Sequence, residues 1–226
     1  MFTGFTDETV DFMWGIRFNN ERSWFEAHKE TYRTQFYQPM RELGSEMYAY
    51  LQELLPDDGL ICKVSRIYRD ARRLHGRGPY KESLWFTIER PAEQWTAKPV
   101  FWFELMPENW TYGMGYYLPK PLTMAKLRAR IDHDPETMAA LTRKLNAQAE
   151  FCLDTENYKR PKSATPLPLL EPWYQVKSFS ICHTDKLTDE IFSRAITGHL
   201  KDGYKFLIPY YQYFITLDGD PDPREQ

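Results

Sequence analysis

Residues 84–118 read LWFTIERPAEQWTAKPVFWFELMPENWTYGMGYYL, and this stretch decides the fold. Leu84, Phe86 and Ile88 occupy every second position, which is the period of a strand with one buried face. Pro-Glu-Asn at 107–109 is a short connection suited to an antiparallel hairpin. Together with an apolar run before it, the stretch predicts strands at 60–66, 84–89, 100–106 and 111–118. We expect them to form a meander with one face covered by helices.

Helical patterns flank this β region on both sides. Start signals are clear at Thr6, which precedes two acidic residues, and at Asp134-Pro135. The helices expected from spacing and caps lie at 7–17, around Trp24 to Tyr32 up to an interruption at Pro39, at 40–55, at 123–131, after Pro135, from Thr188 to about Leu200, and at 209–217. A last strand is expected at 176–181, and 154–171 reads as a long connection containing three prolines.

The pattern predicts an α+β fold: an antiparallel sheet of about four to six strands with helices packed on one face. With 226 residues, 42% of them hydrophobic, the chain has enough apolar material for a sizeable core. No composition break forces a second domain. We therefore expect a single α+β domain over 1–217 and a polar C-terminal tail over 218–226.

The cysteines and the lack of a long apolar run indicate the cellular location that the sequence predicts. Cys62, Cys152 and Cys182 are widely spaced, so neither a disulfide framework nor a zinc knuckle is indicated, and a packing role is expected for all three. The sequence shows no membrane helix and no signal-peptide pattern at its start. It predicts a cytoplasmic protein without a membrane partner.

The segment 66–81, RIYRDARRLHGRGPYK, is the strongest functional signal. From 66 to 82 six basic residues oppose two acidic ones, a balance of +4 in a chain whose net charge is −3. Arginine presents a planar fork of donors that suits phosphates and carboxylates. Because the basicity is local, it favours a compact anionic ligand over nucleic acid.

A small anionic ligand is therefore the predicted partner of this segment, and the sequence says nothing of the oligomeric state. The predicted ligand-binding residues are Arg66, Arg69, Arg72, Tyr80 and Lys81. If Arg66 shares a buried face with its neighbours, its charge needs a partner. The alternative is a non-catalytic interaction or scaffold module, in which the arginines bind an acidic protein or buttress the fold.

Catalytic signatures are absent from the sequence, which leaves open whether the protein is an enzyme. It contains no Walker loop, no nucleophile elbow and no dinucleotide fingerprint, so no cofactor is predicted. Asp70 is the one acid inside the basic motif and is the candidate catalytic base, although it could instead pair with an arginine. The five histidines sit without an obvious carboxylate or second histidine at ligand spacing, so no metal site is predicted.

The basic segment resembles the bacterial family known as domain of unknown function 2461. Its Arg-x-x-Arg-Asp-x-Arg-Phe signature, followed by Pro-Tyr-Lys, is matched at Arg66, Arg69, Asp70, Arg72, Pro79, Tyr80 and Lys81. The block at 19–25, NNERSWF, is similar to a second family motif, and Arg73 departs from the family's phenylalanine. The resemblance implies a single α+β domain of this length and no established activity.

Overall fold

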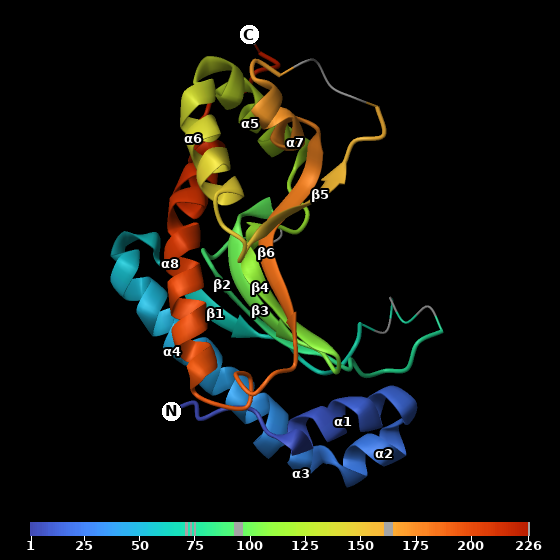
Figure 1. Cartoon of the computed structure of the whole chain (residues 1–226). Coiled ribbons are helices and arrows are strands. Elements are labelled where there is room, and N and C mark those ends of the chain that lie inside the picture. Colours follow the sequence, from blue (N-terminus) through green and yellow to red (C-terminus); the bar gives the residue numbers. More distant parts are fainter. Residues whose placement is uncertain (71, 73, 75, 93–96, 161–164, 226) are drawn as a thin grey trace. The chain divides into compact units, whose positions relative to one another are not determined.

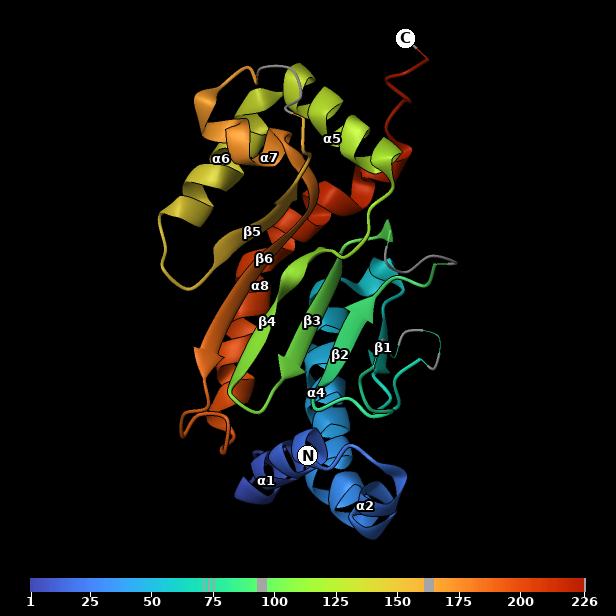
Figure 2. The same ribbon diagram turned by 90° about the vertical axis from the view of Figure 1, so that its right-hand side faces the viewer.

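A computed structural model describes residues 1–70, 72, 74, 76–92, 97–160 and 165–225 of the chain. Its strands form a six-stranded antiparallel sheet with the order β1-β2-β3-β4-β6-β5 (Figures 1 and 2). The strands are β1 (Ile61–Val64), β2 (Leu84–Glu89), β3 (Val100–Leu105), β4 (Asn109–Tyr116), β5 (Cys152–Asn157) and β6 (Val176–Lys186). The predicted α+β class, the meander and the strand number are confirmed.

Helices precede the sheet, interrupt it and follow it along the chain. The α-helices are α1 (Asp7–Phe18), α2 (Arg22–Ala27), α3 (Lys29–Thr31), α4 (Gln38–Leu54), α5 (Pro121–His133), α6 (Pro135–Asn146), α7 (Glu171–Tyr174) and α8 (Ala195–Ile215). A π-helical segment, η1 (Tyr32–Tyr37), precedes α4, and the 3₁₀ segments are η2 (Pro56–Asp58), η5 (Pro168–Leu170) and η6 (Thr216–Gly219).

The chain contacts group into two compact units. Unit 1 comprises residues 1–88, 102–112 and 184–202, and unit 2 comprises residues 89–101, 113–183 and 203–226. Strands β2, β3, β4 and β6 and helix α8 contribute residues to both.

In unit 1 the apolar face of the meander is covered by α4. Gly44 on this helix leaves room for Cys62 and Phe86, since a Cβ there would lie 3.2 Å from each of these side chains. At the start of α8, the His199 ring meets Trp110 of β4 edge-on, with ring centroids 5.2 Å apart. Phe86 and Trp110 are fully buried, and the alternation of Leu84, Phe86 and Ile88 predicts this for Phe86.

In unit 2 the second half of α8 packs against the sheet. Phe101 of β3 contacts Tyr211 at a centroid distance of 4.8 Å. The hydroxyl of Tyr116 on β4 donates a hydrogen bond to the carbonyl of Phe214. In the terminal segment, Asp220 accepts two hydrogen bonds from Arg130 on α5. Helix α8 thus covers the strands in this unit too.

Helix boundaries differ from prediction at two prolines. Pro39 lies in the first turn of α4, which follows η1 without a gap, so helical backbone continues through the position where an interruption was predicted. Pro209 lies inside α8, which runs unbroken from Ala195 to Ile215 where two helices were predicted. Buried aromatic side chains on both sides of Pro209, among them Tyr204 and Tyr211, outweigh the lost hydrogen bond.

Two further expectations are wrong. The predicted connection 154–171 begins within strand β5, which pairs with β6, and it also holds η5 and the first residue of α7; residues 161–164 lie outside the described part. Strand β5 is mostly exposed and polar, so it lacks the apolar alternation that reveals a strand. Cys152, on this strand, is exposed, which excludes the predicted packing role for it.

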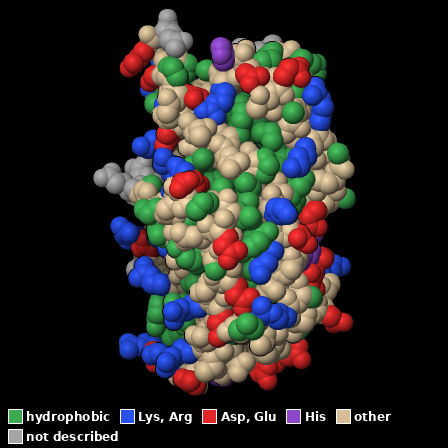
Figure 3. Space-filling view, turned by 90° about the vertical axis from the view of Figure 1, so that its left-hand side faces the viewer, with side chains coloured by type: hydrophobic (Ala, Val, Ile, Leu, Met, Phe, Trp, Pro, Cys, Tyr) green, Lys and Arg blue, Asp and Glu red, His purple; other side chains and the backbone are tan. Residues whose placement is uncertain are grey.

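The surface carries both signs of charge. On the face shown in Figure 3, basic and acidic side chains are interspersed and no broad area of one sign stands out. In the described part of the chain no helix has the length and apolar character needed to span a bilayer.

Candidate functional site

The two halves of the basic motif lie side by side in unit 1. We call residues 66–82 the basic loop; 71, 73 and 75 within it are not described, so Arg73 stays outside this account. Arg69 N donates to Pro79 O at 2.8 Å, and Lys81 N donates to Ile67 O at 2.7 Å. The loop therefore closes as an antiparallel pairing that leads directly into β2 (Figure 2).

Asn20 fixes this pairing from the N-terminal helices. Its Nδ2 donates to Tyr80 O at 3.0 Å, and Tyr80 N donates to its Oδ1 at 2.9 Å. A Cβ at Gly78 would overlap the Asn20 amide, so only glycine fits at this position. Asn20 and the segment GPYK at 78–81 thus hold each other in place, and we call this contact the clamp.

Tyr80 packs into the core at the base of the basic loop. Its side chain is 3% exposed and stacks on Phe25 at a centroid distance of 4.3 Å. Burial raises the pKa of its hydroxyl. The Tyr80 carbonyl also accepts a hydrogen bond from Arg69 Nε at 2.7 Å. Tyr80 therefore orients Arg69 through its backbone.

Three cations gather where the loop enters β2. Lys81 Nζ donates to Arg66 O at 2.6 Å and lies 4.0 Å above the centre of the Trp85 ring. Burial, followed by the charges of Arg66 and Arg69, lowers the pKa of Lys81 to about 8. Burial and the charge of Arg77 lower the pKa of Arg69 in turn. Cations that repel one another in this way form a site of excess positive charge.

The nearby carboxylates only partly offset this charge. Glu104 of β3 accepts a hydrogen bond from Ser83 Oγ at 2.7 Å; burial raises its pKa, which Ser83 and the Lys81 charge oppose. Glu82 is held by Arg17, whose Nε donates to it at 2.6 Å. Within the described residues, Lys81 has no carboxylate at ion-pair distance.

Lys81 and Glu104 also define what the site could do chemically. A lysine whose pKa is near 8 and a carboxyl whose pKa is raised both exchange protons closer to neutrality than their ordinary counterparts. Sequence reasoning missed Glu104 because its contact with the loop is made across neighbouring strands. The available signal was the alternation of Lys81, Ser83 and Trp85 where the chain enters β2, since residues two apart in extended backbone point to the same side.

Arg72 and Asp70 pair with each other. Asp70 accepts hydrogen bonds from Arg72 Nε at 3.0 Å and from Arg72 Nη2 at 2.8 Å. The Arg72 side chain is 88% exposed. Arg66 lies beyond the end of β1 and is exposed, so the argument that its burial demands a partner does not hold. Arg66, Arg69 and Lys81 are brought together, while Arg72 contacts Asp70.

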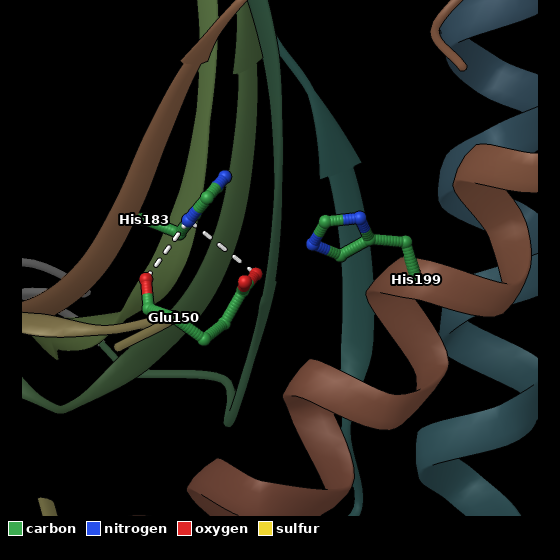
Figure 4. Close-up of side chains that lie close together, drawn as sticks. All are labelled: Glu150, His183 and His199. Carbon is green, nitrogen blue, oxygen red and sulfur yellow. Dashed lines mark hydrogen bonds and ion pairs between the residues drawn. The ribbon is translucent and has the colours of Figure 1, made fainter. Parts of the chain in front are cut away.

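Two histidines lie beside carboxyl-bearing residues that do not stand at ligand spacing in the sequence. In unit 2, His183 Nδ1 lies 2.8 Å from Glu150 O and 3.4 Å from Glu150 Oε1 (Figure 4). In unit 1, His199 Nδ1 lies 2.8 Å from Glu190 Oε1. The sequence separations hid both contacts, because neither pair has the short spacing of a helical ligand motif.

The fold and the loop define an α+β protein in which a basic loop joins the first two strands of an antiparallel sheet. The chain belongs to the family described as Conserved hypothetical protein (DUF2461), whose model matches residues 8–213. The resemblance seen in the sequence is therefore confirmed. A search of the curated proteins found no match to this chain.

Proposed function

We propose that the protein binds a small anionic ligand, bearing phosphate or carboxylate, through Arg66, Arg69 and Lys81. The observation that carries the proposal is the environment of Lys81. Its ammonium is partly removed from water and lies near two arginines, with no ion pair to a described carboxylate. An anion placed there would relieve the repulsion among the three cations.

The remaining predicted residues take different parts in this proposal. Tyr80 positions Arg69 through its carbonyl and need not touch the ligand. Arg72 is a rim contact that can exchange Asp70 for the anion, since the pair is exposed. Asp70, engaged with Arg72, serves to orient that guanidinium and is a weaker candidate for a catalytic base than Glu104. A cytoplasmic location remains part of the proposal.

The scaffold alternative also has a specific observation in its favour. Arg69 Nε is bonded to the Tyr80 carbonyl and Arg72 to Asp70, so two arginines of the motif make intramolecular contacts. If these contacts are the whole role of the motif, its arginines should affect stability and not ligand binding.

Calorimetric titration with inorganic phosphate distinguishes ligand binding from the scaffold role. Arg66→Gln removes an exposed charge that makes no described side-chain bond, and it should weaken phosphate binding about ten- to a hundredfold, since a charge-assisted hydrogen bond contributes about 1.5–3 kcal/mol. Arg160→Gln, at an exposed arginine of unit 2, is the matched control and should bind as the wild type does. Absence of phosphate binding to the wild type, or equal affinity in all three proteins, would refute the proposal.

A further inference from the structure

Cys152 and Cys182 face one another across two neighbouring strands of unit 2. They are direct partners in the antiparallel register of β5 and β6. Cys152 Sγ lies 3.4 Å from the carbonyl oxygen of Cys182, and the two thiols are close enough to share a hydrogen bond. Both are reduced, with Cys152 exposed and Cys182 half-buried.

This placement meets the geometric demand of a disulfide. Directly opposed residues of antiparallel strands have Cα atoms about 4.5–5.5 Å apart, which falls within the range of about 4.4–6.8 Å seen across disulfides. Because both thiols already point to the same side of the ribbon, a bond between them requires side-chain rotation and little backbone movement. Two cysteines in this arrangement can form a disulfide with each other, which an isolated thiol cannot do.

We propose that Cys152 and Cys182 form a reactive dithiol that low-molecular-weight disulfides, such as oxidised glutathione, convert to an intramolecular disulfide. The exposed Cys152 thiolate attacks one sulfur of the small disulfide, forms a mixed disulfide and releases one thiolate. Cys182 then loses its proton to solvent, attacks Cys152 Sγ and expels the second small thiol. Overall, two protein thiols are oxidised and one small disulfide is reduced to two thiols.

The environment of the two sulfurs sets this order of events. Burial raises the pKa of Cys182 to about 11, so its thiolate is scarce and Cys152 is the sulfur open to a soluble reagent. Asp154, on the neighbouring strand β5, also raises the pKa of Cys182, because its negative charge disfavours the thiolate. Cys182 reacts second because the mixed disulfide is then held directly opposite it.

The test uses the full chain, oxidised glutathione and a count of free thiols in denaturant. The wild type should fall from three free thiols to one, and mass spectrometry should link the peptides that contain Cys152 and Cys182. Cys62→Ser is the matched control and should lose both of its thiols.

Cys182→Ser should stop with glutathione retained on Cys152, and Cys182→Ala serves if the serine variant fails to fold. The proposal is overturned if the wild type keeps glutathione on Cys152 without closing the disulfide, or if only Cys62 reacts.

Discussion

Lys81→Met offers a direct test of the charge balance in the basic loop. The folded protein lowers the pKa of Lys81 from about 10.5 to about 8. Between these values the unfolded chain holds more protons than the native state, so the free energy of unfolding rises with pH across this window. Below about pH 8 the protonated Lys81 lowers the free energy of unfolding by its full amount. This destabilisation is relieved as the pH approaches 10.5.

The size of the effect follows from the same two pKa values. The difference between about 10.5 and about 8 corresponds to roughly 3 kcal/mol, at about 1.36 kcal/mol for each pKa unit. Lys81 is only half-buried, and solvent screening reduces the figure to about 1–2 kcal/mol. Replacing Lys81 by methionine keeps the aliphatic packing on Trp85 while it removes the titrating group.

Urea denaturation at about pH 7 and about pH 10 provides the measurement. The free energy of unfolding of Lys81→Met, relative to wild type, should fall by about 1–2 kcal/mol between the two pH values, because only the wild type gains stability from deprotonation. Lys205→Met, at an exposed lysine on α8, is the matched control and should show no such change. A pH-independent difference for Lys81→Met, or one of opposite sign, would refute the reasoning.

Three further substitutions test the surroundings of the loop. Gly78→Ala should destabilise the protein by about 1–3 kcal/mol, because the new methyl group overlaps the Asn20 amide; an unchanged urea midpoint would contradict this. Trp24→Ala should cost about 2–3 kcal/mol in the same assay, at the low end for aromatic deletions, because the side chain is half-buried. Asp70→Asn should leave the midpoint within error, since its pair with Arg72 is exposed, and a large loss would show that the pair supports the fold.

Much of the fold could be predicted because local signals and tertiary packing agree. The alternation at 84–89 locates β2 residue for residue, and Asp134 does cap α6 by accepting a hydrogen bond from Thr137 N. Strand β5 escaped prediction because its exposed polar residues carry no apolar period, and its pairing with β6 is decided by contacts outside the segment.

For the candidate site, the sequence predicts the charged residues but not the contacts that surround them. The cluster of basic residues could be read from the sequence, but the low pKa of Lys81 arises from burial, followed by the charges of Arg66 and Arg69, which the folded loop brings near it. Asn20 acts on Tyr80 from 60 residues away, and Ser83 reaches Glu104 across 21 residues. Sequence spacing cannot reveal such contacts, because they depend on how the loop folds back on β2.

The clamp between Asn20 and Gly78 has a consequence for how this chain can change over time. A side chain at position 78 requires that the amide at position 20 withdraw, and a shorter residue at position 20 removes the reason for glycine at position 78. The two positions should therefore covary among relatives, with glycine at 78 wherever asparagine is kept at 20. A designer who transplants the basic loop into another protein must carry both residues together.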